Sequence, residues 1–163
     1  MKILCLTGTS HYQFNRLVKN VDLLLGPEFS VTIQSGHTKY KTKYSESFDF
    51  CDKKELISLI KNADIIITQG GYGSMMDSLL LHKKVIAVPR KLQLKETLHD
   101  QTEHVEYLSF KGYLLACYDV LELPRYVTNL LSNDVKLTFF RPESEIKIST
   151  LVENFINNTF SNK

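Results

Sequence analysis

The chain has 163 residues, of which 43% are hydrophobic and 23% charged, and its net charge is +2. This length fits one domain with a substantial core and is too short for two full α/β domains. The small net charge gives no electrostatic reason to expect a nucleic-acid partner. No apolar stretch approaches the roughly 20 residues of a membrane span, and the N-terminus has no signal-peptide pattern. We therefore expect a cytoplasmic protein, or one that a partner holds at a membrane.

Strand and helix patterns alternate through the first part of the chain. Residues 2–6 form an apolar strand, and a helical repeat of apolar side chains over residues 14–25 is stopped by a Gly-Pro pair. Residues 30–34 alternate like a strand. Residues 35–47 are polar and have no apolar period, which predicts an exposed loop. A capping-box pattern then opens a helix over residues 52–60.

The stretch from Ile65 to Ser74 carries the most information. A wholly apolar run, typical of a strand buried on both faces, ends in a turn with Gly70, Gly71 and Gly73, and a helical pattern begins after it. Free N–H groups and the positive dipole at such a helix start suit a phosphate. The turn therefore predicts a nucleotide or its diphosphate as ligand. It neither completes the dinucleotide pattern nor precedes a P-loop lysine.

The rest of the chain continues the alternation. Residues 85–88 form a buried strand stopped by a proline, and a helical pattern over residues 98–112 precedes a strand over residues 113–117. Residues 119–131 form a last compact helical unit. Residues 142–163 are predicted to form a separate helix that packs either on its own sheet or on a partner. Its apolar stripe consists of Ile148, Leu151, Val152, Phe155 and Ile156.

Alternating strands and helices of this length predict an α/β fold, with a doubly wound parallel sheet and helices on both faces. In such sheets ligands bind at the carboxyl edge of the strands, near the switch in strand order. This rule brings three segments to one rim: Thr7-Gly8-Thr9, Gly70–Ser74 and Pro89-Arg90.

The cysteines are three in number and widely spaced among apolar or mixed neighbours: Cys5, Cys51 and Cys117. An odd number without metal-ligand spacing predicts reduced thiols that fill core space. His82, His99 and His104 have no consistent ligand spacing with carboxylates either. The sequence thus predicts no metal site and no cofactor.

Six short motifs follow one another between residues 2 and 125. They are Thr7-Gly8-Thr9, Phe14-Asn15-Arg16-Leu17-Val18, Gln34-Ser35-Gly36-His37, Gln69-Gly70-Gly71-Tyr72-Gly73-Ser74, Val88-Pro89-Arg90 and the segment from Glu96 to Gln101. Together they resemble the glycosyltransferase family 28 C-terminal domain, in the single-domain, PssE-like form of bacterial capsule and exopolysaccharide synthesis. That form is similar to the donor-binding subunit of the eukaryotic two-subunit UDP-GlcNAc transferase. It also resembles the C-terminal half of the peptidoglycan lipid II transferase.

The resemblance implies a Rossmann-like domain of the GT-B C-terminal type over residues 1–141, which binds a UDP-sugar donor. It further implies that a membrane-anchored partner subunit supplies the site for a lipid-linked acceptor and the catalytic base. One sheet domain of this size has no facing domain to close over an acceptor, and ligand clefts favour domain interfaces. We therefore expect the chain at the inner face of the membrane, held there by its partner.

The family's His-Ala-Gly-x-Gly-Ser motif falls on residues 69–74. The resemblance implies that Gly71, Gly73 and Ser74 present N–H groups to the diphosphate, whose negative charge grows as UDP leaves. Gln69 replaces the usual His, and Gly70 replaces the usual Ala. A glutamine donates a hydrogen bond but cannot carry a proton, so any cationic help at this position is lost.

Two other candidates have a structural alternative. Asp77 falls where relatives bind the ribose hydroxyls, but Ser74-x-x-Asp77 is also close to a capping box. Phe50 falls where relatives place the apolar wall of the uracil pocket, but an aromatic residue at this point also suits the core. The sequence leaves both pairs of interpretations open.

The family's donor-sugar motif falls on His99-Asp100-Gln101, with Glu96 ahead of it. Gln101 matches the motif, whereas Asp100 stands where His is usual and His99 is a shifted substitute for it. A carboxylate and an amide suit sugar hydroxyls because they supply an acceptor and a donor–acceptor pair. For Glu96 the alternative is a solvated helix start.

The predicted rim holds the remaining candidates. Gly8 and Thr9 follow the first strand and are predicted to contact the substrate. Arg90 is predicted to pair with a phosphate, to form an interface charge, or to be an ordinary surface residue. His11 is the one candidate general base in this chain, although the resemblance places the base on the partner.

The sequence therefore predicts the donor-binding subunit of a glycosyltransferase. It would move a sugar from a UDP-sugar to a lipid-linked saccharide and be active only with its partner. A non-catalytic UDP-binding regulatory module on the same fold is the second hypothesis, because Gln69 and Asp100 both replace usual histidines. An orphan flavodoxin-like domain is the third.

Overall fold

The computed structural model describes residues 1–141, and the predicted C-terminal helix with its apolar stripe lies outside the described residues. The strands are β1 (Lys2–Leu6), β2 (Ser30–Gln34), β3 (Glu46–Phe48), β4 (Ile65–Gln69), β5 (Lys84–Val88) and β6 (Leu115–Ala116). The helices are α1 (Asn15–Leu25), α2 (Lys53–Asn62), α3 (Tyr72–Leu80), α4 (Thr102–Phe110) and α5 (Leu123–Leu131), with short 3₁₀ turns η1 (Leu92–Leu94) and η2 (Val120–Glu122). Among these helices, none is long and apolar enough to cross a membrane.

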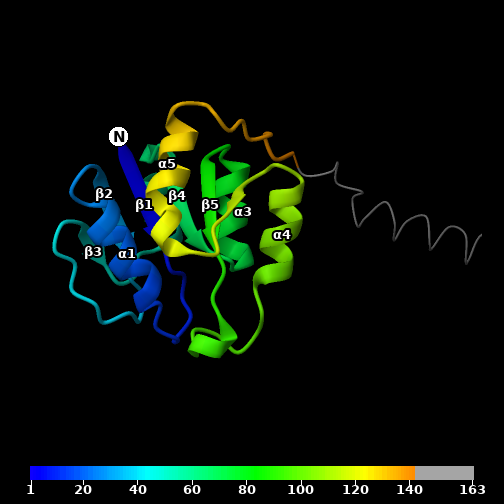
Figure 1. The fold of residues 1–163 in the computed structure, drawn as a ribbon. Helices are drawn as coiled ribbons and strands as arrows, with labels where there is room; N and C mark the ends of the chain where they lie inside the picture. The colour runs from blue at the N-terminus through cyan, green and yellow to red at the C-terminus, as the bar shows by residue number, and fades with distance from the viewer. Residues whose placement is uncertain (142–163) are drawn as a thin grey trace, which may run out of the picture.

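All six strands lie in one parallel sheet with the order β3-β2-β1-β4-β5-β6 (Figure 1). The chain winds outward from β1 to β3, returns to place β4 beside β1, and then winds outward to β6. The direction of winding therefore switches between β1 and β4. This confirms the predicted doubly wound α/β fold, and it puts the carboxyl ends of β1 and β4 at the position where such sheets bind ligands.

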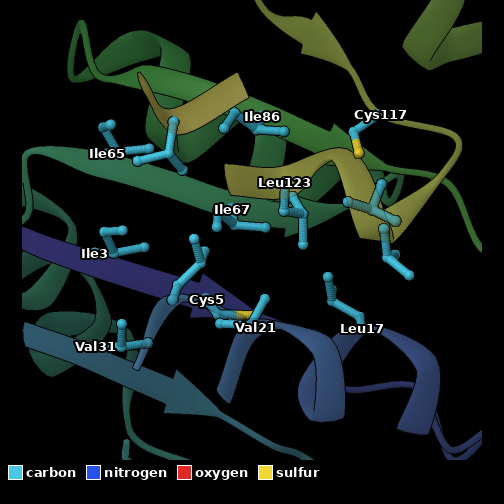
Figure 2. Close-up of a cluster of buried hydrophobic side chains, with 14 of the residues drawn as sticks. Ile3, Cys5, Leu17, Val21, Val31, Ile65, Ile67, Ile86, Cys117 and Leu123 are labelled. Atoms are coloured by element: carbon cyan, nitrogen blue, oxygen red, sulfur yellow. The ribbon is translucent and has the colours of Figure 1, made fainter. Parts of the chain in front are cut away.

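The core has two layers because successive strand side chains point to opposite faces of the sheet. Ile3, Cys5 and Ile67 pack against α1 and α5 on one face (Figure 2). Leu4 and Ile66 pack against α2, α3 and α4 on the other face. The central strand β4 is buried along its whole length, which explains its continuous apolar run.

Burial explains the state of the cysteines. Cys5 and Cys117 are buried in the α1/α5 layer, and Cys51 is partly buried near the carboxyl edge; all three are free thiols. Burial raises the pKa of the Cys117 thiol to about 12, and it also raises the pKa of Cys5. Both thiols are therefore neutral core side chains, as the sequence predicts.

The structure corrects several predicted element bounds. The helix after the glycine turn starts at Tyr72, because Gly71 takes the extended conformation of an N-cap and the next glycine enters the first turn. Helix α4 starts only at Thr102, and Leu98 ahead of it is exposed. Of the predicted strand over residues 113–117, only Leu115–Ala116 forms a strand, β6, which pairs with β5.

The prediction of an exposed loop over residues 35–47 is correct in part: residues 35–45 form no helix or strand, and several of them are exposed. However, Ser35 and Thr38 are buried, and the end of the segment forms the edge strand β3, which pairs with β2 through Thr32 and Glu46. An edge strand pairs on one side only, so a strand of three residues can form there without an alternating apolar pattern.

Asp22 of α1 holds this segment against the domain. Its buried carboxylate accepts hydrogen bonds from the N–H groups of Lys43, Tyr44 and Ser45 at 2.8–2.9 Å and from the Tyr40 hydroxyl at 3.0 Å. Burial alone would raise the pKa of Asp22, but these hydrogen bonds outweigh it and keep the pKa below its ordinary value. One charged group thus orders a long polar segment.

Replacing this carboxylate with an amide should destabilise the domain in a pH-dependent way. Asp22→Asn should lower the free energy of unfolding by about 1–3 kcal/mol at pH 7, because buried N–H donors lose a charged acceptor. A lowered folded-state pKa contributes stability above the ordinary pKa of about 4, and this contribution disappears as the pH falls through the folded-state value. The difference between variant and wild type should therefore shrink from pH 7 to pH 3 in urea unfolding. An equal difference at both pH values would contradict this role, and Glu28→Gln on the exposed surface is the control.

Candidate functional site

A cleft of about 260 Å³ lies at the carboxyl ends of β1, β2 and β4, between α2 and α3. This is the switch point of the sheet. Its lining residues are Gly8, Thr9, Gln34, Phe50, Cys51, Leu56, Gln69, Gly71, Tyr72, Gly73, Ser74 and Asp77. Most of the predicted site residues therefore meet in one place, although they come from distant parts of the chain.

A larger hollow of about 560 Å³ lies at the opposite end of the sheet. It is bounded by residues 133–140, by the start of β5 and by the end of α3. None of the predicted site residues lines it, and no N-terminus of the helices within residues 1–141 lines it either. The smaller cleft therefore remains the candidate site.

The start of α3 forms one wall of the cleft. Gly71 caps the helix without any side-chain hydrogen bond, and its carbonyl accepts from the N–H of Met75. The N–H groups of Tyr72, Gly73 and Ser74 have no carbonyl partner within the helix. A Cβ on Gly73 would meet nothing within 4 Å, so the backbone is open to a ligand there. This wall can bind an anion through N–H groups and the helix dipole.

The side chain of Gln69 lies beneath the glycine turn. Its Oε1 accepts a hydrogen bond from Nε of Arg90 at 2.6 Å. A Cβ on Gly8 would lie 2.1 Å from the Gln69 Nε2, and a Cβ on Gly71 would lie 2.8 Å from it. The amide thus lies close against both backbones, and Gly8 also has a φ of +76°, a conformation that favours glycine.

Gln34 fixes the loop after β1, and no functional role is predicted for it from the sequence. Its Oε1 accepts from the Gly8 N–H at 2.9 Å, and its Nε2 donates to the carbonyls of Gly8 and Asp49. The Gly8 N–H is therefore already used within the protein, and Gly8 contributes shape to the cleft. The signal for Gln34 is its place as the last residue of β2, beside the end of β1.

Asp77 lies on the second turn of α3 and pairs with Lys53 at the start of α2. This pair spans the two helices that flank the cleft. The capping-box interpretation of Asp77 is wrong, because Gly71 is the N-cap and no side chain caps α3. Contact with ribose hydroxyls stays a prediction for Asp77, and Lys53 is a neighbour that the sequence pattern does not reveal.

Aromatic rings flank the outer side of the cleft. Phe50 is 49% exposed, so the core interpretation is wrong, and its ring contacts His37 edge to face at a centroid distance of 5.0 Å. The His37 ring lies 6.4 Å from that of His11. His11 is exposed beside the cleft but does not line it. A general-base role for His11 and a place for Phe50 in the apolar wall of a uracil pocket stay predictions.

Arg90 is buried, with only 2% of its surface exposed. Its guanidinium donates to the carbonyls of Thr7, Tyr12 and Glu96 at 2.9 Å, besides Gln69. Burial lowers its pKa to about 10, so it stays protonated at neutral pH. The interpretation of Arg90 as an ordinary surface residue is therefore wrong. Its guanidinium N–H groups donate hydrogen bonds to acceptors within the protein.

Glu96 also faces inward. Its carboxylate forms a two-point ion pair with Arg16 at 2.9 and 3.0 Å and accepts from the Lys91 N–H at 2.8 Å. The alternative interpretation of Glu96, as a solvated residue at a helix start, is therefore wrong. Arg90 and Glu96 do not line the cleft.

The remaining candidates lie beside the cleft, at the start of α4. Oδ1 of Asp100 accepts from the Thr102 N–H at 2.8 Å, and hydrogen bonding by Thr102 lowers the pKa of Asp100. The Gln101 amide accepts from the Arg90 N–H at 3.2 Å and lies against Gly70, where an added Cβ would be 2.9 Å from the Gln101 Cβ. Neither side chain lines the cleft, so contact with a donor sugar stays a prediction for both.

Within residues 1–141, no three His, Cys, Asp or Glu side chains lie close enough to hold a metal ion. The donors that line the cleft are backbone N–H groups, hydroxyls and amides. Chemically, the site can hold an anionic group by dipoles and hydrogen bonds.

The sequence of the chain matches the model of the glycosyltransferase family 28 C-terminal domain over residues 2–151. The match extends beyond residue 125, where the six motifs end. Among curated proteins, no sequence matches this chain.

Three solved structures illustrate the likeness of the fold. The glycosyltransferase SnogD from Streptomyces nogalater has a TM-score of 0.60 at 15% identity, over 81% of this chain and 35% of its own. UDP-GlcNAc 2-epimerase from Neisseria meningitidis, bound to UDP-GlcNAc, has a TM-score of 0.58 at 16% identity, over 94% and 44%. MurG from Acinetobacter baumannii has a TM-score of 0.52 at 15% identity, over 83% and 41%. This chain spans less than half the length of each, and the likeness shows the GT-B C-terminal-type fold.

The inward position of Glu96 leads to a stability prediction. Glu96→Gln should lower the free energy of unfolding by about 1.5–3 kcal/mol, because a mostly buried Arg16 loses its charged partner. Urea unfolding monitored by circular dichroism would measure this loss, with Glu46→Gln on the exposed edge strand as the control. A change within about 0.5 kcal/mol of the control would show that Glu96 is not a structural anchor.

Proposed function

This chain belongs to the glycosyltransferase family 28 C-terminal domain family, and from that premise we propose that it is the donor-binding subunit of a glycosyltransferase. It binds a UDP-sugar and moves the sugar, a hexose, to a lipid-linked saccharide in capsule or exopolysaccharide synthesis. The observation that carries this proposal is the N-terminus of α3, which has no side-chain cap and opens into a cleft at the switch point of the sheet. That arrangement suits the diphosphate of a nucleotide-sugar.

The size and openness of the cleft support a two-part enzyme. Its volume of about 260 Å³ is at the low end for a ligand site, and small-molecule sites usually bury most of the ligand. Tyr72 and Phe50 on its rim are 65% and 49% exposed. A facing half is therefore needed to enclose the donor, and we propose that a membrane-anchored acceptor-binding subunit supplies it. The chain would then lie at the cytoplasmic face of the membrane through this partner.

In the proposed reaction an acceptor hydroxyl oxygen forms a bond to the anomeric carbon of the sugar. The bond from that carbon to the diphosphate breaks, UDP leaves with the electron pair, and a base on the partner takes the hydroxyl proton. The N–H groups of Gly73 and Ser74 stabilise the negative charge that grows on the diphosphate oxygens. Dipoles that are fixed in place before the reaction do this without reorganisation.

Nucleotide binding tests the donor site directly. UDP should bind more tightly than ADP in isothermal titration calorimetry. Gly73→Val should lower the UDP affinity roughly 100-fold, because its branched side chain would enter the space where a Cβ now meets nothing. Ser58→Val, on the exposed side of α2, is the matched control and should bind UDP like the wild type. Equal affinities for UDP and ADP would contradict the assignment of the nucleotide.

Sugar transfer tests the division of labour. The isolated chain should bind UDP without transferring sugar, and transfer should appear when it is co-expressed with an acceptor-type membrane subunit. Deleting residues 143–163 should leave a folded domain that binds UDP but no longer co-purifies with that subunit. Robust transfer by the isolated chain would contradict the two-part enzyme. UDP binding without transfer in the complex would favour the regulatory module instead.

A further inference from the structure

We propose that Arg90 is a positioning residue that turns the amide of Gln69 so that its NH₂ group becomes a hydrogen-bond donor to the diphosphate in the cleft. This inference rests on the proposed function, because it assigns a ligand contact within the same site. It gives Gln69 a role of its own, as a neutral donor at a position where the family usually has a His.

The orientation of the Gln69 amide follows from the chemistry of its neighbour. A guanidinium has donors only and cannot accept a hydrogen bond. The Gln69 atom that faces the Arg90 Nε at 2.6 Å must therefore be the oxygen, and the NH₂ group must point the other way. Amide orientation is often ambiguous, but an arginine partner removes the ambiguity here.

Arg90 itself has little freedom to move. Besides Gln69, it donates to the carbonyls of Thr7, Tyr12 and Glu96, which lie on two segments: the loop between β1 and α1 and the loop after β5. The guanidinium carbon also lies 4.5 Å from the centroid of the Phe14 ring. A donor that is fixed at several points holds its acceptor in one place, so the Gln69 amide is preorganised for binding.

The NH₂ group of Gln69 lies between the two glycines whose backbones form the walls of the phosphate end of the cleft. The distances from Nε2 to the Cβ positions of Gly8 and Gly71 place it there. Among residues 1–141, the one hydrogen bond of the Gln69 side chain is that of its Oε1 with Arg90, so the NH₂ group donates to no protein acceptor there. Gln69 is 8% exposed and lines the cleft. The donor is thus directed at the ligand, next to the free N–H groups of α3.

A charge substitution that keeps the Arg90 contact tests the donor. Gln69→Glu keeps an oxygen facing Arg90 and places a second oxygen where the NH₂ group was. UDP affinity should fall at least 30-fold, whereas uridine, which has no phosphate, should bind within about twofold of the wild type. Gln93→Glu on the exposed η1 turn adds the same charge away from the cleft and should leave both affinities unchanged. UDP binding by Gln69→Glu within threefold of the wild type would overturn the inference.

A double-mutant cycle tests the positioning role. Arg90→Lys keeps the charge but cannot reach all the acceptors, so UDP affinity should fall about tenfold. In a Gln69→Ala background the same change should alter UDP affinity less than twofold, because Arg90 acts through Gln69. Thermal stability should fall in both backgrounds, because the contacts of Arg90 with the carbonyls of Thr7, Tyr12 and Glu96 are weakened in each. An equal loss of UDP affinity in both backgrounds would overturn the positioning role. If Arg90→Lys does not fold, the comparison of UDP and uridine for Gln69→Glu decides the inference.

Two outcomes separate this inference from the proposed function. A wild-type protein that binds none of UDP, GDP, dTDP or ADP would overturn the proposed function and this inference with it. A wild-type protein that binds UDP tightly, with Gln69→Glu binding it equally well, would overturn the Gln69 inference alone.

Discussion

The carboxyl edge of the sheet depends on one buried guanidinium. Arg90, just after β5, donates hydrogen bonds to the end of β1, to the loop that follows it, to the end of β4 and to its own loop. The loops at this edge carry no regular hydrogen-bond ladder, so each needs its own partners. A single planar group with five N–H donors supplies partners to several loops at once. The glycine turns then sit on a rigid base, which a site that recognises a diphosphate by geometry requires.

Much of this architecture can be predicted from the sequence, because its determinants are local. The run Ile65–Ile67 predicts a strand buried on both faces, and β4 is the central strand that lies between the two helical layers. The switch-point rule then brings residues from β1 and β4 together without any knowledge of contacts. Gly8, after β1, and Gly73, after β4, are far apart in the chain, yet both line one cleft.

What could not be predicted depends on contacts between distant residues. Glu96 and Arg16 are 80 positions apart, and each looks like an ordinary surface charge in its own sequence context. The same holds for Asp22, whose partners lie about 20 positions away in a segment without any apolar period. Strand β3 could not be predicted because its three residues have no alternating apolar pattern, and pairing with β2 stabilises the strand instead. The spacing of apolar residues along the sequence indicates which face of a helix or strand is buried, whereas the spacing of charged and polar residues does not show whether they point inward or outward.

The electrostatics of the cleft favour the proposed facing half. Among residues 1–141, no Lys or Arg side chain lines the cleft, and nearby cations have partners already: Arg90 with protein carbonyls, Arg16 with Glu96, and Lys53 with Asp77. In the proposed function the charge of a diphosphate would be met by dipoles, namely the start of α3 and the amide of Gln69. Dipoles of this kind act most strongly where water is excluded, and this cleft is open to solvent on its outer side. A second half that covers the cleft would strengthen every one of these interactions at the same time as it brings the acceptor. The proposed dependence on a partner would then follow from the physics of a neutral, open anion site.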